Sequence, residues 1–421
     1  MKKPKVLVIS HNCFSDSGSN GRTLANFFEG YPSEKLAQFY IYNETPSVAT
    51  CDNYYRITDA DAVKSVFSNK YGGMIGRLQA HDSAQIARSA TPKLRKTSLV
   101  YCIRELVWKM GHWDNKRLKR WIEDFAPEVV LFQAGDAAFL FDFARRISQK
   151  RNIPLVIYNS ENYYFKSHNY LTAAAEADLG YRILHGYFRR HAAKAIRHAS
   201  CSVYISDMLR EIYDAKFHVP SVTIMTSTKL LESEKVIKEE KTQISYLGNL
   251  GVGRHETLME LASILQSVDP MCEICVYGKA EPTIVQMLDN APGIRYCGFV
   301  SYNECVEIMK SSMMLIHVEN FSDFYQMDSK YAFSTKIADS LACGTCLFVY
   351  APRELSCAKY LSGNGAACVA SDPDEARTKL ELLLRSRESR EKLERKAVEI
   401  AAENHSVERN RQRFLDVIQQ L

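Results

Sequence analysis

The sequence has no apolar run long enough to cross a membrane, which excludes an integral membrane protein built on spanning helices. None of its 421 residues lies in a stretch approaching the roughly 18 consecutive apolar residues that such a helix needs. The chain begins with lysines and continues into a short apolar segment, which predicts a first β-strand and not a signal peptide. We therefore expect a cytoplasmic protein, working in the cytoplasm or at the inner face of the cell membrane.

The twelve cysteines lack the spacing of a zinc site or of a disulfide framework. Two Cys-x-x-Cys spacings occur, at Cys272/Cys275 and at Cys343/Cys346. The first lies in a predicted strand, where residues three apart face opposite sides. The second has no histidine or cysteine partners at zinc-finger distance. We expect buried, reduced thiols, and neither a metal nor a cofactor.

Two common nucleotide-binding fingerprints are also missing. Gly251 and Gly253 match the first two glycines of the pattern Gly-x-Gly-x-x-Gly, but Glu256 stands at the position of the third glycine. The glycine loop near the N-terminus lacks the spacing of a P-loop. These absences argue against an ordinary NAD dehydrogenase and against a P-loop enzyme. No recognisable nucleic-acid-binding module is present, so we expect no nucleic acid partner.

The charge is divided unevenly along the chain. Residues 1–230 contain 32 Lys and Arg against 21 Asp and Glu, a difference of +11. The remainder contains 22 against 28, a difference of −6. The first half should therefore favour an anionic surface, and the second half should not.

Short apolar segments alternate with helical patterns along the chain, which is typical of parallel sheets with helices on both faces. The polar, charged segment 231–243 is the best candidate for a domain linker. We expect an α/β fold with two Rossmann-like, doubly wound domains that face each other across a cleft. The predicted domains are residues 1–232, residues 233–405, and a C-terminal helix in 406–421 that packs back on the first domain. The predicted strands are 6–10, 37–42, 128–133, 154–158, 201–205, 222–226, 244–248, 273–277, 294–297, 314–318, 347–350 and 367–369.

Two predicted helices of the second domain begin with a cation, Arg254 in one and Lys336 in the other. The helix dipole is already positive there, so a cation is normally unfavourable. Its presence indicates an anion, such as a diphosphate, held between the two helix starts. Asp339 lies on the same helix face as Lys336, and its carboxylate could accept hydrogen bonds from two hydroxyls of a ribose. The alternatives are a tight turn with a solvated Arg254, and a surface ion pair between Lys336 and Asp339.

The first domain offers fewer candidates. Gly18, Gly21 and Arg22 follow the first predicted strand and could bring amides and a cation to the cleft from the opposite side. The alternative is a plain strand-to-helix connection. His11 and Glu161, each just past a strand, are candidates for contacts to a second substrate, with local capping or turn bonding as the alternative.

All three tryptophans, Trp108, Trp113 and Trp121, fall in one basic stretch of residues 93–121. A second basic segment covers residues 182–197. Aromatic and basic residues on amphipathic helices suit the surface of an anionic membrane. The equal alternative is a set of helices packed on the first sheet with solvated outer faces.

Four segments of the second domain resemble retaining glycosyltransferases with the GT-B fold, specifically family 4-like enzymes of bacterial surface polysaccharide assembly. The segments are Tyr246–Arg254, Val276–Gly278, Cys297–Val300 and Thr335–Gly344, and the resemblance spans most of the chain. It implies a nucleotide-diphosphate sugar as the donor substrate, and sugar transfer with retention of configuration and without a metal. It also implies a saccharide or lipid-linked acceptor, a role in capsule or exopolysaccharide synthesis, and peripheral contact with an anionic membrane.

The resemblance assigns roles to residues by their position in these segments. The residues expected to contact the diphosphate are Gly248, Gly253, Arg254, Thr335 and Lys336. Asp339 is expected to bind the ribose. The residues expected near the base are Tyr277, Gly278, Phe299 and Val300. Asp339 takes the second position of the Glu-x7-Glu motif of the family, but the first position is Tyr331, so the motif is broken. Glu319 and Asp328 are candidates to replace the missing glutamate, and Glu319 and His11 are the candidates for catalysis.

Two other functions suit the same residues. A nucleotide-sugar 2-epimerase of the same fold would interconvert donor sugars without an acceptor. A non-catalytic subunit of an assembly complex would bind the nucleotide-sugar without turnover, which the broken motif favours.

Overall fold

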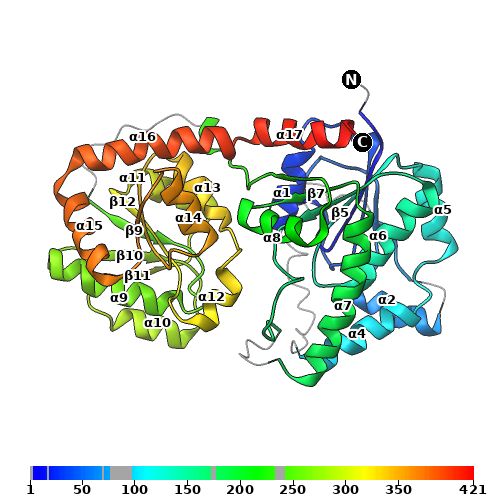
Figure 1. The fold of residues 1–421 in the computed structure, drawn as a ribbon, viewed down its shortest axis with the longest axis horizontal. Helices are drawn as coiled ribbons and strands as arrows, with labels where there is room; N and C mark the ends of the chain where they lie inside the picture. Colours follow the sequence, from blue (N-terminus) through cyan, green and yellow to red (C-terminus); the bar gives the residue numbers. More distant parts are fainter. Residues whose placement is uncertain (1–2, 17–18, 69–70, 76–96, 172–176, 233–241) are drawn as a thin grey trace. The chain divides into compact units, whose positions relative to one another are not determined.

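A computed structural model describes residues 3–16, 19–68, 71–75, 97–171, 177–232 and 242–421 (Figure 1). Contacts within the chain divide it into two compact units. Unit 1 comprises Met1–Ile224 together with Asn410–Leu421, and unit 2 comprises Met225–Arg409. The predicted divisions after residues 232 and 405 lie near these boundaries.

Unit 1 is built on an eight-stranded sheet with the strand order β4-β3-β2-β1-β5-β6-β7-β8. All neighbouring strands are parallel except β3 and β4, which pair antiparallel at one edge. The strands are β1 (Val6–Ser10), β2 (Leu36–Tyr40), β3 (Tyr54–Arg56), β4 (Gly73–Ile75), β5 (Val129–Gln133), β6 (Leu155–Asn159), β7 (Cys201–Tyr204) and β8 (Ser221–Thr223).

Helices cover both faces of this sheet because its central strands are apolar on both sides. The helices are α1 (Ser19–Phe27), α2 (Asp59–Phe67), α4 (Ser98–Met110), α5 (Lys116–Phe125), α6 (Ala138–Arg151), α7 (Leu179–His198), α8 (Asp207–Phe217) and α17 (Val407–Gln419). On one face, α1 lies beside α17 (Figure 1), and Phe27 of α1 stacks on Phe414 of α17 with ring centroids 4.4 Å apart. On the other face, Phe39 of β2 packs on Phe143 of α6 at 5.0 Å. The C-terminal helix therefore completes the core of unit 1.

Unit 2 is built on a six-stranded, fully parallel sheet with the order β11-β10-β9-β12-β13-β14. The strands are β9 (Ile244–Leu247), β10 (Ile274–Tyr277), β11 (Ile294–Gly298), β12 (Met314–Val318), β13 (Cys346–Tyr350) and β14 (Cys368–Ala370). The helices are α9 (Arg254–Val268), α10 (Pro282–Asp289), α11 (Tyr302–Ser311), α12 (Asp323–Ser329), α13 (Thr335–Ala342), α14 (Ser356–Gly363), α15 (Pro373–Arg385) and α16 (Arg387–Asn404). One core cluster joins α9 and α15 to the central strands.

The prediction of two doubly wound α/β domains is confirmed by these sheets. The two short strands β3 and β4 were missed. The three residues of β4 include Gly73 and carry no run of strand-forming side chains. All twelve cysteines are free, and six of them are buried. None of the helices in the described part of the chain combines the length and the apolar character that a membrane span requires.

The tryptophans decide between the two interpretations of the basic stretch. Trp108, Trp113 and Trp121 are buried, and Trp108 stacks on Phe139 of α6 with centroids 4.1 Å apart. Their indole nitrogens donate to Asp59, to the Trp108 carbonyl and to Asn53, respectively. These side chains belong to the core of unit 1, so they are not the membrane anchors that the aromatic and basic pattern suggested.

Candidate functional site

The most promising place in unit 2 is the carboxyl edge of its sheet between β9 and β12. The chain leaves β9 toward β10 on one side, whereas β12 continues toward β13 on the other, so the strand order reverses here. Loops diverge at such a point and leave a crevice where parallel sheets bind ligands. The loop after β9 carries Arg254, and the end of β12 carries Glu319. The sequence pattern therefore places two candidate residues at the point where the topology predicts a site.

Arg254 and Glu319 form a forked ion pair. The Nε of Arg254 donates to Oε2 of Glu319 at 3.1 Å, and Nη2 donates to Oε1 at 2.8 Å. The side chains of Arg254 and Glu319 are 19% and 5% exposed. Burial alone would raise the pKa of Glu319, but the imidazole of His317, whose Nε2 lies 3.4 Å from Oε1, and the charge of Arg254 lower it. Glu319 is therefore a carboxylate, and it fixes the guanidinium while Nη1 takes no part in the fork.

Lys336 lies close enough to Arg254 for the two positive charges to interact. Desolvation and then the charge of Arg254 lower the pKa of Lys336, whereas Asp339 acts in the opposite direction. Two like charges are normally kept apart in a ligand-free site, so their approach indicates a place for an anion. Thr335 begins the same helix, α13, one residue before Lys336.

Both helix starts also lack a capping side chain among the described residues. Gly253 is the N-cap of α9 and Ser334 is the N-cap of α13, and neither helix has a side-chain hydrogen bond at its cap. Helix starts without caps present amide hydrogens and partial positive charge to a ligand. Unit 2 thus has two helix starts without capping side chains, each with a cation in its first turn, and the charges of these two cations interact.

Close backbone packing shapes the loop that carries Arg254. Gly253 has a φ of 68°, and a Cβ there would lie 2.4 Å from Nδ2 of Asn320. Asn320 holds the loop by donating to the Gly253 carbonyl at 2.9 Å and to Oε2 of Glu256 at 2.9 Å. Just after β10, a Cβ on Gly278 would lie only 2.0 Å from the carbonyl oxygen of Gly248, which follows β9. The predicted glycines are therefore required for the approach of neighbouring loops, and Asn320 is a site residue that the sequence pattern missed.

The residues assigned to the base and the ribose differ in their exposure and in their partners within unit 2. Phe299, 66% exposed, follows β11, and Nζ of Lys279 lies 4.3 Å from its ring centroid. Val300 follows Phe299 and is half-buried. The Tyr277 hydroxyl instead accepts from Gln243 at the start of β9, so its ring turns away from the carboxyl edge. Asp339 accepts from the hydroxyl of Tyr302, 3.4 Å away.

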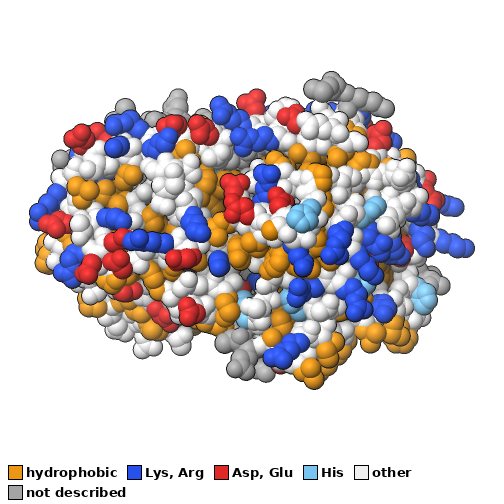
Figure 2. All heavy atoms as spheres, viewed as in Figure 1, with side chains coloured by type: hydrophobic (Ala, Val, Ile, Leu, Met, Phe, Trp, Pro, Cys, Tyr) orange, Lys and Arg blue, Asp and Glu red, His pale blue; other side chains and the backbone are white. Residues whose placement is uncertain are grey.

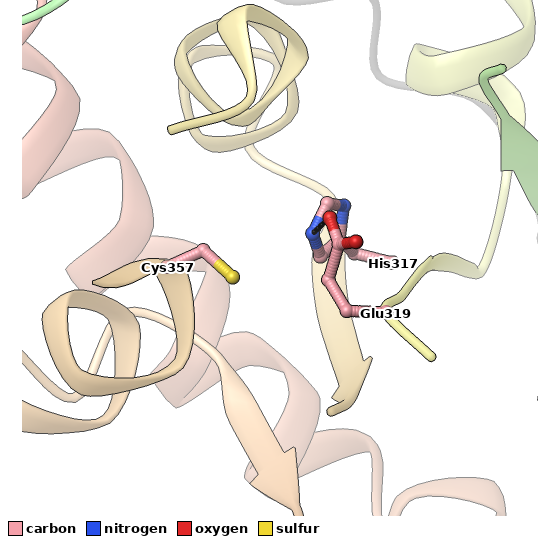
Figure 3. A group of neighbouring side chains, drawn as sticks. All are labelled: His317, Glu319 and Cys357. Atoms are coloured by element: carbon pink, nitrogen blue, oxygen red, sulfur yellow. Dashed lines mark ion pairs between the residues drawn. The ribbon is translucent and has the colours of Figure 1, made fainter. Parts of the chain in front are cut away.

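One group of side chains in unit 2 has the chemistry of a metal site (Figure 3). His317, Glu319 and Cys357 offer ligand atoms that all lie within 4.8 Å of one another, and Cys357 directs its sulfur from the start of α14 toward the other two. Burial and the charge of Glu319 raise the pKa of Cys357. Both oxygens of Glu319 already accept from Arg254. A metal here would compete with the guanidinium for the same carboxylate, so the donor set favours the ion pair.

Unit 1 contains a polar pocket of about 300 Å³ at the carboxyl edge of its own sheet. His11 and Glu161, both predicted from the sequence, line it together with Gln133 and Asp136 after β5. Burial would raise the pKa of Asp136, but His11, whose Nε2 lies 3.5 Å away, and Arg104 lower it to about 2. The remaining lining includes four tyrosines: Tyr42, Tyr101, Tyr163 and Tyr170.

Gln133, the last residue of β5, and Asp136, which follows the strand, were missed by the sequence analysis. Asp136 follows its strand at the same edge as His11, so the rule that selected His11 would also have selected Asp136. Gln133 ends β5 itself and is 2% exposed, and neither atom of its amide has a partner among the described residues. An unpaired buried amide in the wall of a pocket marks a place for a polar ligand.

The predicted glycine loop of unit 1 has a structural role. Arg22 donates from Nε and Nη2 to the Asp16 carbonyl, at 3.2 and 3.0 Å. A Cβ on Gly21 would lie 2.6 Å from the Cys13 carbonyl oxygen, so α1 can start this close to the preceding loop only with glycine. Arg22 is therefore engaged within its own loop. Gly18 lies outside the described residues.

Comparison with protein families gives a match that covers most of unit 2. Residues 255–416 match the family described as glycosyl transferase-like. Comparison with curated proteins gives no match.

Solved structures similar to the whole chain show the same fold at low identity. HepE from Anabaena in complex with UDP and glucose is 10% identical, with a TM-score of 0.62, 99% of this chain and 100% of that chain covered. Sucrose-phosphate synthase from Thermosynechococcus elongatus is 10% identical, with a TM-score of 0.62 and coverage of 99% and 98%. A UDP-forming trehalose-phosphate synthase from Burkholderia xenovorans, in complex with glucose-6-phosphate, is 10% identical, with a TM-score of 0.57 and coverage of 99% and 100%. The fold is thus that of GT-B glycosyltransferases.

Proposed function

We propose that the protein is a glycosyltransferase that moves a sugar from a nucleotide-diphosphate donor to a saccharide or lipid-linked acceptor. In this proposal unit 2 holds the donor, and the polar pocket of unit 1 holds the acceptor. Transfer retains the anomeric configuration, needs no metal, and serves surface polysaccharide assembly. The observation that carries the proposal is the approach of Arg254 and Lys336 beside two uncapped helix starts.

The negative charge that develops on the leaving group during the reaction would lie beside these cations and amides. The bond between the anomeric carbon and the β-phosphate oxygen breaks, the acceptor oxygen forms a new bond to that carbon, and the acceptor hydroxyl passes its proton to the departing phosphate oxygen. Negative charge then gathers on the leaving diphosphate. Nη1 of Arg254, Nζ of Lys336 and the amides of α13 would stabilise it, a contribution of several kcal/mol in such sites. Glu319 acts in this scheme as a positioning residue, because its carboxylate is already committed to Arg254.

A ligand screen by thermal unfolding tests the donor site. UDP is the first choice, because HepE is described in complex with UDP and glucose. At a concentration of about 100 Kd, UDP should raise Tm by roughly 2–4 °C, since it binds only the folded protein. UMP, which lacks the second phosphate, is the matched control and should give a smaller shift. No shift with any nucleoside diphosphate or its sugar would reject the proposal.

Turnover assays then separate three functions. Incubation with donor sugar alone should leave the sugar unchanged, whereas a 2-epimerase would interconvert it. Addition of saccharide or lipid-linked acceptors should release the nucleoside diphosphate. Binding without turnover across a broad acceptor panel would favour a non-catalytic subunit instead.

Replacement of Gln133 by leucine should raise the KM for the acceptor about tenfold and leave the Kd for UDP unchanged, because one or two hydrogen bonds are lost. The free energy of unfolding should stay constant or rise, since the native amide has no partner among the described residues. Gln38→Leu on β2, which is separated from β5 by β1, is the matched control. Gln38 is equally buried and bonds to the Phe14 amide and to Ser10. The Gln38→Leu variant should lose stability. An unaltered KM for the acceptor in Gln133→Leu would show that the pocket does not bind the acceptor.

A further inference from the structure

Three side chains of unit 2 bring three kinds of donor atom to one place (Figure 3). They are the imidazole of His317, the carboxylate of Glu319 and the thiol of Cys357. His317 lies on β12 and Glu319 directly follows it, and residues two apart on a strand face the same side. Cys357 lies in the first turn of α14, and its sulfur points toward the other two side chains. A strand end and a helix start therefore hold the group together.

The distances in this group suit a tetrahedral zinc ion. The ligand atoms lie within 4.8 Å of one another, and Nε2 of His317 lies 3.4 Å from Oε1 of Glu319. Zinc binds nitrogen, oxygen and sulfur at about 2.0–2.3 Å, so two ligand atoms of a tetrahedral site lie about 3.3–3.8 Å apart. The distance between His317 and Glu319 already has this value. A shift of no more than about 1 Å by the Cys357 side chain would complete the site.

The chemistry of the donors selects the metal. Ca²⁺ and Mg²⁺ take oxygen ligands, so a group with an imidazole and a thiol does not suit them. One nitrogen, one oxygen and one sulfur suit Zn²⁺, and three protein ligands leave a fourth position for water. Nε2 of His317 is a buried atom without a hydrogen bond among the described residues, so no existing bond has to be broken there. The imidazole is therefore available to a metal.

Zinc and Arg254 would compete for the same carboxylate. Nη2 of Arg254 donates to Oε1 of Glu319 at 2.8 Å, and Oε1 is also the oxygen that faces His317. A zinc ion on Oε1 would take the place of the bond from Nη2. It would also bring a divalent cation next to the guanidinium, and the two positive charges would repel each other. The carboxylate thus has two exclusive states, one with the guanidinium and one with the metal.

We propose that His317, Glu319 and Cys357 form a zinc site whose occupation displaces Arg254 from Glu319 and so inhibits sugar transfer. The binding of zinc follows from these three side chains alone. The inhibition rests on the proposed function, in which Glu319 holds Arg254 in position for the donor diphosphate. When zinc binds, the S–H bond of Cys357 breaks, a Zn–S bond forms and the proton passes to the solvent. No oxidant or reductant is needed.

Cobalt as a spectroscopic substitute for zinc tests the site in the full chain. One Co²⁺ per chain should give the charge-transfer band of a thiolate–cobalt bond, and Zn²⁺ should abolish the band by replacing Co²⁺. Acidic side chains are scattered over the surface where Figure 1 places α9 to α16 (Figure 2). They could bind Co²⁺ weakly, but they offer only oxygen and cannot give this band.

Replacement of Cys357 by alanine should abolish the band and lower the affinity for Zn²⁺ by about a hundredfold or more. Even the loss of a group behind a metal ligand costs 10–100-fold, and here a ligand itself is lost. Cys357→Ser should give the same result, and it keeps the volume of the side chain if alanine impairs folding. Cys346→Ala is the matched control, since Cys346 is also buried, at the start of β13 in the same unit. It should leave the band and the affinity unchanged.

Replacement of Arg254 by alanine tests the competition. The carboxylate of Glu319 would then have no guanidinium to release, so the affinity for Zn²⁺ should rise by about tenfold or more. In the unaltered protein, Zn²⁺ at saturation should inhibit sugar transfer, whereas the same concentration should have little effect on Cys357→Ala. Any complex between Zn²⁺ and the nucleotide is common to both proteins and cancels in this comparison.

The outcomes separate this inference from the proposed function, because metal binding is measured without nucleotide or acceptor. No metal binding by the unaltered protein, a thiolate band that persists in Cys357→Ala, or a lower affinity for Zn²⁺ in Arg254→Ala would overturn the inference. Equal inhibition of the unaltered protein and Cys357→Ala would overturn the inhibitory role. Zinc binding as described, without a thermal shift by any nucleoside diphosphate or its sugar, would contradict the proposed function alone.

Discussion

Replacement of Arg254 by alanine should lower kcat/KM for sugar transfer by about a hundredfold to a thousandfold, because the charge nearest the leaving diphosphate is removed. The same change should lower the free energy of unfolding by about 3 kcal/mol, since Glu319 then stays buried as a carboxylate without its partner. Steady-state kinetics and chemical denaturation measure the two effects separately.

The double variant Arg254→Ala/Glu319→Gln distinguishes a loss of folding from a loss of chemistry. Removing the charge of Glu319 removes the unpaired carboxylate, so most of the stability should return. The activity should not return, because no cation faces the diphosphate at this position. Recovery of activity in the double variant would show that Arg254 only stabilises the fold, and the proposed donor site would have to be abandoned.

Replacement of Lys336 by methionine should weaken UDP binding about tenfold to a hundredfold and leave the fold intact. A charge-assisted hydrogen bond to a phosphate is lost, whereas the exposed side chain of Lys336 does not belong to the core cluster of unit 2. Isothermal titration with UDP measures the change. Lys310→Met on α11 is the control for the removal of a lysine from unit 2, and it should bind UDP normally.

The pH dependence of binding gives an independent signature of Lys336. Desolvation and the charge of Arg254 lower its pKa, so in the free protein Lys336 loses its proton at a lower pH than an ordinary lysine. A diphosphate binds the protonated form better. The affinity for UDP should therefore be full on the acid side of this pKa and should fall as the pH rises through it. In Lys336→Arg this fall should disappear, while ionisation of UDP affects both proteins equally. Identical pH profiles would exclude Lys336 from the diphosphate site.

The order of strands and helices could be predicted because each apolar run is short and each is followed by a helical pattern. Arg254 and Lys336 could be selected as candidates because a cation at a helix start conflicts with the helix dipole. The partner of Arg254 could not be selected in the same way. Glu319 is 65 residues further along the chain, and it meets Arg254 only because β12 pairs with β9 in the sheet.

Side-chain direction was the other obstacle to prediction. Tyr277 ends its strand as expected, but its hydroxyl accepts from Gln243, which no local pattern reveals. The tryptophans showed the same difficulty, since basic neighbours made them resemble a membrane motif while long-range packing buried them. On α4, exposed apolar residues such as Ile103 and Leu106 alternate at helical spacing with buried residues such as Trp108. Which side faces solvent depends on α2, α6 and α7, and so on contacts that a single segment does not contain.

The stacking of Phe414 on Phe27 has a consequence for the order in which the protein matures on the ribosome. Unit 2 has all of its residues once Arg409 has been synthesised, whereas the core of unit 1 still waits for Phe414, Leu415 and Ile418. Domains usually form in the order of synthesis. Here the core of the unit that starts first is completed last, so the apolar side chains that pack on Phe414 stay uncovered until the other unit has been synthesised.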